Sequence, residues 1–113
     1  MTLLEKLKTC LTPLNIPFET GIFSDKAPDT YMVIVPMNDT YEVHADNKPL
    51  IDVEEARLSI FTKGSYTAVK GSVVRALLLA DITITARNYI GFETETGYHH
   101  YNVDVADYLE TED

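Results

Sequence analysis

The sequence predicts a single α+β domain, a two-layer sandwich in which two helices cover one face of a mainly antiparallel sheet of four to five strands. Two segments repeat apolar residues at helical spacing, and four or five others are rich in β-branched and aromatic residues. Their order is helix, two or three strands, helix, two strands. A chain of 113 residues, 45% of them hydrophobic, has the size of one domain with its own core. We assign residues 1–113 to it, with a flexible acidic tail from about 108.

The first helix is expected to begin at Thr2, because Glu5 three residues later completes the pattern of a capping box. Pro13 predicts that it ends near Leu11 or Thr12. The second helix is expected to begin after Ser65, a good N-cap residue. The apolar stripes of the two helices are Leu3, Leu7, Cys10, Leu11 and Leu14, and Tyr66, Val69, Val73, Ala76, Leu77 and Ala80.

Strands are expected at residues 17–23, 31–36, 53–62, 82–90 and 98–109. The run YMVIVP is the most strongly β-like, and Pro36 is expected to stop it. The inward residues of the last three strands are Ala56, Leu58 and Ile60, then Ile82, Ile84 and Ala86, then Tyr101, Val103 and Val105. The strand–helix–strand step from residue 53 to residue 90 has the length of a crossover, so one parallel pair is possible.

Both faces of the 31–36 strand are apolar, with Met32 and Ile34 on one face and Tyr31, Val33 and Val35 on the other. Two helices cover only one face. The second face is therefore expected to be covered by another copy of the chain, by another protein, or by residues 37–52 folding back as a lid. The residues left outside the predicted core stripes are Phe61, Tyr89, Ile90 and Phe92. An exposed apolar area of this kind usually marks a contact site.

Residues 37–52 are a long connection for two neighbouring strands, and such loops are usually functional. They include His44, Asp46 and Asn47, which favour turns, together with Tyr41 and other apolar residues. The sequence therefore leaves two interpretations open, a lid over the chain's own sheet or a segment that contacts a neighbour.

Eighteen acidic and nine basic residues give a formal net charge of −9. A surface of that sign repels phosphates and disfavours sequence-specific binding of DNA or RNA. This net charge remains compatible with a protein that mimics nucleic acid, or with one that lines a passage through which DNA slides. The single cysteine, Cys10, excludes an intrachain disulfide, and no apolar run is long enough to span a membrane.

The candidate metal ligands are His44, Glu95, His99, His100 and Asp104. Neighbouring residues of a strand point to opposite faces, so His99 and His100 diverge, and the face of His100 adds only Asn102 and Asp104. One imidazole with one carboxylate and one amide is a poor transition-metal site. Cys10 lies on an apolar stripe, where it acts as a small hydrophobic residue. The sequence predicts no enzyme, cofactor or metal, and instead a binding or structural protein.

Several phrases resemble a known family. They are LLEKLKTCL, PDTYMVIVP, HADNKPLIDVEEARLSIFTKG and ETGYHHYNVDVADY, with ITITARNYI between them. Together they are similar to the tail-terminator or tail-completion proteins (head–tail joining or neck proteins) of long-tailed phages and prophages of Gram-positive bacteria. The likeness extends over nearly the whole chain.

The resemblance implies a structural role in virion assembly, in which copies form a ring, commonly of six, that ends the tail and joins it to the head and neck. The implied partners are further copies and other tail or neck proteins, and DNA passes through the ring without specific binding. The implied location is the virion, and the host cytoplasm during assembly. The expected contact residues are Tyr41, His44, Asp46, Asn47, Phe61, Tyr89 and Phe92.

Two other readings remain open from the residues. An acidic inhibitor or DNA mimic would present carboxylates spaced like phosphates on one surface. A small metal-dependent hydrolase would use His99, His100 and Asp104.

Overall fold

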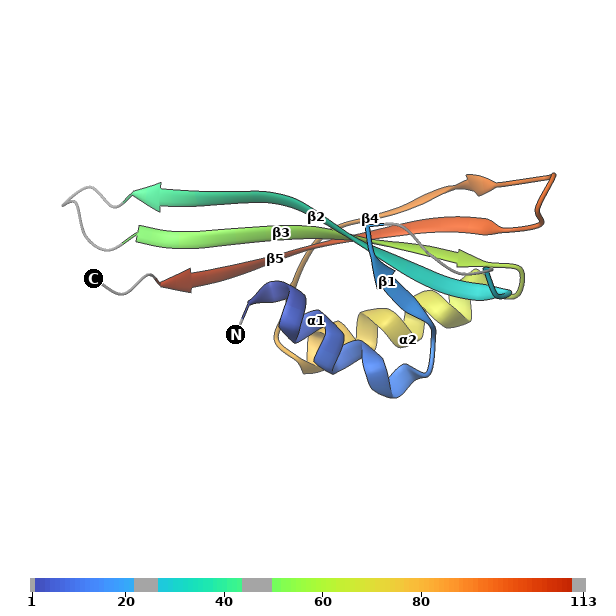
Figure 1. Ribbon diagram of the computed structural model, residues 1–113, viewed down its shortest axis with the longest axis horizontal. Helices are drawn as coiled ribbons and strands as arrows, with labels where there is room; N and C mark the ends of the chain where they lie inside the picture. Colours follow the sequence, from blue (N-terminus) through green and yellow to red (C-terminus); the bar gives the residue numbers. More distant parts are fainter. Residues whose placement is uncertain (1, 22–26, 44–49, 111–113) are drawn as a thin grey trace.

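The computed structural model describes residues 2–21, 27–43 and 50–110, except for the side chains of 39–43, 50, 51, 109 and 110. The helices are α1 (Leu3–Leu11), a 3₁₀ turn η1 (Thr12–Leu14) and α2 (Tyr66–Leu79). The strands are β1 (Phe18–Thr20), β2 (Thr30–Val43), β3 (Leu50–Thr62), β4 (Thr83–Phe92) and β5 (His99–Glu110). Figure 1 shows the long strands twisting past one another above the two helices.

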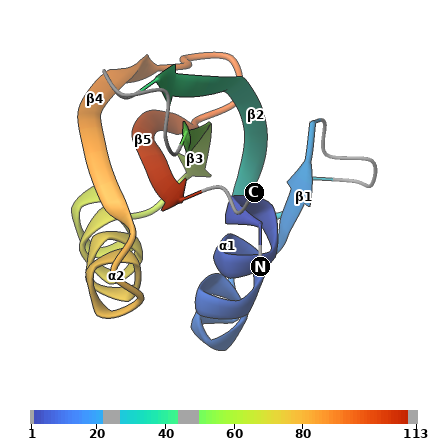
Figure 2. The same cartoon turned by 90° about the vertical axis from the view of Figure 1, so that its left-hand side faces the viewer.

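The five strands form one sheet in the order β1-β2-β3-β5-β4. All neighbours are antiparallel except β1 and β2. Figure 2 shows both helices on the same side of the sheet, which confirms the predicted α+β sandwich. The crossover through α2 does not create a hydrogen-bonded parallel pair, because β5 lies between β3 and β4. The parallel pair is instead formed by β1, which covers β2 only from Met32 to Ile34.

The first helix begins as predicted. The hydroxyl of Thr2 accepts a hydrogen bond from the amide of Glu5 at 3.2 Å, and the Glu5 carboxylate accepts one from the amide of Thr2 at 2.9 Å. The amide of Leu3 donates to Glu54 Oε1 at 3.1 Å, which joins the start of α1 to β3. Lys6 Nζ lies 2.7 Å from Asp107 Oδ2, which joins the helix to β5. These contacts fix α1 against the middle of the sheet.

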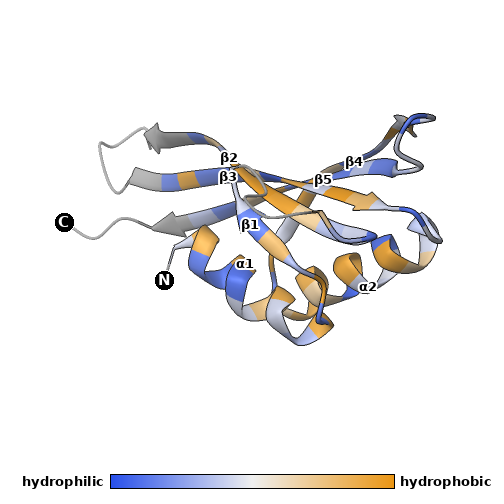
Figure 3. Ribbon diagram, turned by 45° about the vertical axis from the view of Figure 1, so that its right-hand side comes forward, coloured by the Kyte–Doolittle hydropathy of each residue, from blue (hydrophilic) through white to orange (hydrophobic). Residues whose placement is uncertain are grey.

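The core lies between the helices and the sheet, and it contains most of the side chains of the predicted stripes. Two predicted core residues lie elsewhere: Ala80 is exposed, and a register shift between Ile84 and Ala86 aligns Ala86 with Asp104, on the face away from the helices. Its fully buried side chains include Leu7 and Leu11 of α1, Val73 and Leu77 of α2, and Met32, Ile34, Leu58, Ile60, Val103 and Val105 of the sheet. Figure 3 shows hydrophobic colouring on both helices and along the central strands between them. Alternation along β3 and β5 and 3.6-residue periodicity along each helix therefore select this face, whereas in β4 the register shift after Ile84 reverses it.

Pro36 does not end its strand, which contradicts the sequence-based expectation. β2 continues to Val43 and remains paired with β3 as far as Leu50. The register shifts between Pro36 and Asp39, and β2 has no neighbour beyond Ile34 on its other side within the described residues. A proline is tolerated at such an irregular, edge position because no ladder hydrogen bond needs its missing N–H.

The interpretation of residues 37–52 as a lid is consequently wrong for the parts that the structure describes. Residues 37–43 and 50–52 are strand, and β2 and β3 run together past the N-terminus of α1 (Figure 1). We call this projection, residues 37–43 of β2 with the facing ends of β3 and β5, the arm. Residues 44–49 lie outside the described part. β5 extends to Glu110, past the position near 108 at which a tail was expected to begin.

Candidate protein–protein interface

The middle of the second sheet face, opposite the helices, is polar. Arg57 of β3 donates to both carboxylate oxygens of Asp104 on β5, at 2.8 and 3.1 Å, and these bonds raise the pKa of its guanidinium. Beside them, the Ser59 hydroxyl donates to Asn102 Oδ1 at 3.1 Å, and both residues are buried. Cross-strand polar pairs therefore occupy much of the face for which the sequence suggested an apolar cover.

An aromatic cluster lies at one end of this second face. The Phe61 ring stacks on Tyr31 at 4.9 Å and on His100 at 4.3 Å, and the Tyr98 ring meets Tyr31 edge-on at 5.4 Å. The Tyr98 hydroxyl donates to the carbonyl of Pro28 at 2.6 Å. Phe61, one of the predicted contact residues, is thus half-buried inside the protein's own packing. Burial also raises the pKa of Tyr31.

A second aromatic group lies on the helix side, at β4. The Tyr89 ring is 4.8 Å from Tyr66 of α2, its hydroxyl is 3.0 Å from His99 Nδ1, and Phe92 is 4.8 Å from His99. Tyr89, Phe92 and the intervening Ile90 remain 44%, 51% and 53% exposed. We call these three residues the β4 patch. Their exposure is as predicted, and their role in a contact stays a prediction.

The structure separates Phe61 from the β4 patch. Phe61 pairs with His100, and Phe92 pairs with His99, the preceding residue of the same strand. Neighbouring residues of a strand point to opposite faces, so the two phenylalanines lie on opposite sides of the sheet. The predicted exposed residues therefore do not form one continuous surface.

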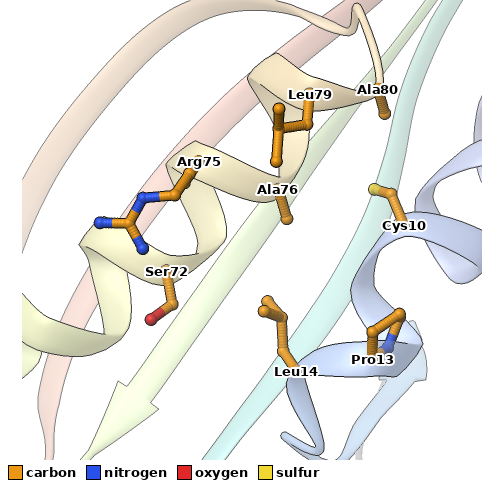
Figure 4. Close-up of a pocket in the computed structure, with 8 residues that line it drawn as sticks. All are labelled: Cys10, Pro13, Leu14, Ser72, Arg75, Ala76, Leu79 and Ala80. Carbon is orange, nitrogen blue, oxygen red and sulfur yellow. The ribbon is translucent and has the colours of Figure 1, made fainter.

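A groove between the two helices is a surface that the sequence analysis missed. It has a volume of about 430 Å³ and is lined mainly by apolar groups, including Cys10 and Leu14 on one side and Ala76 and Leu79 on the other. Figure 4 shows these side chains facing one another across the gap, with Arg75 at one end. Leu79 is 82% exposed. The run Leu77-Leu78-Leu79 carried the signal, because three consecutive residues of a helix cannot all face the core.

Burial raises the pKa of the Cys10 thiol in this groove, which lowers its thiolate fraction at neutral pH.

His99 and His100 diverge as expected. Within the described part of the chain, no group of three histidine, cysteine, aspartate or glutamate residues is arranged to hold a metal ion. Asp104 and Asp107 point to opposite faces, and each pairs with its own cation.

The remaining predicted contact residues lie in or near the arm. The backbone of Tyr41 is in β2, opposite Asp52. The Tyr41 side chain lies outside the described part, as do His44, Asp46 and Asn47.

No described helix is long and apolar enough to cross a membrane.

Comparison with known proteins shows a likeness of fold. The chain is similar to one from the virion of a native gene transfer agent particle, with a TM-score of 0.55 and 9% sequence identity. The match covers 96% of this chain and 91% of the other. No protein-family model matches the sequence, and no curated protein is detectably similar to it. At this identity the two chains share an architecture.

Proposed function

We propose that this chain is a structural, non-enzymatic subunit of a phage or phage-like virion, namely a ring-forming tail terminator or tail-completion protein. Its partners are further copies of itself and the adjoining tail and neck proteins. It acts in the virion, after assembly in the host cytoplasm. The observation that carries the proposal is the likeness of fold to a virion chain, which extends over nearly the full length of both chains.

The surface supports the proposal in two ways. The β4 patch at one side of the sheet and Met37 of β2 towards the other side are exposed apolar groups in two separate places, and a subunit of a ring must contact its two neighbours through different surfaces. The net charge of −9 suits a channel lining, because an acidic wall lets DNA pass without binding its phosphates.

Deletion of the coding gene from an inducible phage genome that carries it tests the role. We expect lysates with filled heads and separate tails of non-uniform length when particles are imaged by electron microscopy, and rescue by the wild-type gene supplied in trans. Normal virions in the deletion lysate would overturn the proposal.

The arm provides a more specific test. We propose that it contacts a neighbouring subunit or the tail tube through Tyr41, His44, Asp46 and Asn47. Replacing residues 38–48 with a short Gly-Ser turn removes these residues together with the β2 partners of residues 50–54, and it leaves in place the core cluster between the helices and the sheet. Loss of head–tail joining, in a subunit that still unfolds in one cooperative urea transition, is the expected result. Unaffected joining would show that the arm makes no essential contact.

A further inference from the structure

β4 is the last strand of the sheet, so one of its edges has no partner strand within the described residues. Along Thr83–Phe92, the alternate residues whose backbone N–H and C=O groups do not point towards β5 therefore present these groups at that edge. Proteins usually protect a long edge strand with charges or prolines. Here the strand carries a single charged residue, Arg87, and three exposed hydrophobic side chains, the β4 patch. This combination is typical of an edge that receives another strand.

The opposite side of the sheet offers a second free edge. β1 covers β2 only between Met32 and Ile34, and Pro36 follows as a position with no N–H to donate. Beyond it, residues 37–43 have β3 on one side and no described strand on the other. Met37 at the start of this stretch is 44% exposed. The arm therefore carries an unpaired edge of seven residues.

We propose that the β4 edge of one copy pairs with the 37–43 edge of the next copy, so that the sheet continues from subunit to subunit. This inference rests on the proposed ring-forming function and names the surfaces that join neighbours. Strand directions agree with it. β2 and β5 run one way and β3 and β4 the other, so a neighbour in the same orientation places its β2 antiparallel to β4.

Charge also favours this pairing. Residues 37–43 contain two acids, Asp39 and Glu42, and no base, whereas the only charge of β4 is the positive Arg87. Pairing β4 with a second β4 about a two-fold axis would instead bring two copies of Arg87 close together near the middle of the strand, where like charges repel. A second copy offering its arm is therefore the better occupant.

The geometry produces a stagger between copies. Thr83 lies opposite Ala106 of β5, whereas the arm lies beyond that level, where Asp39 aligns through Glu54 with Asp107. Pairing β4 with the arm therefore shifts each copy along the strand direction relative to the previous one. A shift of this kind is the shear that closing a sheet on itself requires. The contact is also heterologous, which a closed ring needs.

Site-directed cross-linking tests the proposal. In a Cys10→Ser background, Ile90→Cys marks β4 and Met37→Cys marks the arm, and both positions are exposed. A flexible bismaleimide can join the two thiols in more than one register of β4 against the arm, so the exact register need not be known. Each single variant alone should give no dimer, a mixture of the two should give dimers, and the double variant should give a ladder of oligomers on denaturing gels. Leu79→Cys lies on α2 and is more exposed than either position, so it is a stringent control and should not cross-link to either site.

A charge at the edge supplies an independent measurement. For this measurement Tyr89→Cys marks β4 in place of Ile90→Cys, and Met37→Cys still marks the arm. Adding Ile90→Lys to this pair should reduce the cross-linked product about tenfold, because pairing of the two edges would dehydrate the new ammonium group. An unchanged urea midpoint would show that the fold is intact. Leu79→Lys should leave the yield unchanged.

Three results would overturn the pairing: dimers of Ile90→Cys alone, no product from the mixture in concentrated protein, or equal product with Leu79→Cys. If these occur while deletion of the gene still disrupts virions, the pairing is wrong and the assembly role stands. If the double variant forms its ladder while deletion leaves virions normal, the pairing stands and the tail role is wrong.

Discussion

Replacing Phe61 with alanine tests whether this side chain packs within the subunit or serves as a contact for another protein. Its ring touches Tyr31, Tyr98 and His100 within the subunit. Phe92 is the matched position on the other side of the sheet, where the ring is half exposed and touches His99. Loss of the Phe61 ring should therefore destabilise the isolated subunit, and loss of the Phe92 ring should have a small effect.

The magnitude follows from burial and ring contacts. A phenylalanine-to-alanine change in a full core costs about 3–5 kcal/mol, and each aromatic pair adds about 0.5–1.5 kcal/mol beyond the buried area. Because Phe61 is only partly buried, we expect its replacement to cost about 2–3 kcal/mol. Phe92→Ala should cost about 1 kcal/mol or less on the same reasoning. Phe61→Leu keeps most of the apolar volume and should cost about 1 kcal/mol, mainly for the lost stacking.

Urea unfolding followed by circular dichroism measures these differences. With a slope of about 1.5 kcal/mol per molar urea, Phe61→Ala should lower the midpoint by roughly 1.3–2 M, and Phe92→Ala by about 0.7 M or less. Equal shifts for the two variants would refute the assignment of Phe61 to internal packing. A negligible shift for Phe61→Ala would make it available as a docking residue after all.

Three further predictions concern the start of α1 and its attachment to the sheet. Thr2→Ala removes the N-cap and should lower stability by about 1 kcal/mol, seen as a lower melting temperature, whereas Thr2→Ser should retain it. The hydrogen bonds from Thr2 lower the pKa of Glu5 in the folded state, so the stabilisation is present above the unfolded pKa and is lost as pH falls through the folded value. The difference in stability between the wild type and Glu5→Gln should shrink on acidification, and a pH-independent difference would contradict this sign. Lys6→Met leaves the buried carboxylate of Asp107 unpaired and should lower the free energy of unfolding by about 1–3 kcal/mol. The double variant Lys6→Met with Asp107→Leu should recover most of this stability. An equal loss of stability in the single and double variants would show that the ion pair is not the cause.

The sequence was most informative where structure depends on neighbours along the chain. Thr2 and Glu5 identified the start of α1, and the alternation of Leu58 with Ser59 identified the face that the helices cover. The exposure of Tyr89 and Phe92 was also expected, because both residues lie outside the stripes that the sequence assigned to the core. Pro36 was misleading, because a proline stops a strand only where a neighbouring strand needs a backbone N–H at that position. The sequence does not show that, among the described residues, β2 has no neighbour beyond Ile34 on the side of β1.

Local sequence patterns by themselves therefore determined the two helices, the capping of α1, the core faces of β3 and β5 and the α+β class, since each of these depends on residues a few positions apart. The tertiary structure alone decided that β5 lies between β3 and β4, that residues 37–43 extend a strand, and that Phe61 and Phe92 face opposite ways. The physical reason is that these features depend on which strand lies beside which, and in what register. Pairing joins residues up to 59 positions apart, as between Ile51 and Glu110. Within the described residues, this pairing leaves one edge of β4 and one edge of residues 37–43 without a partner strand.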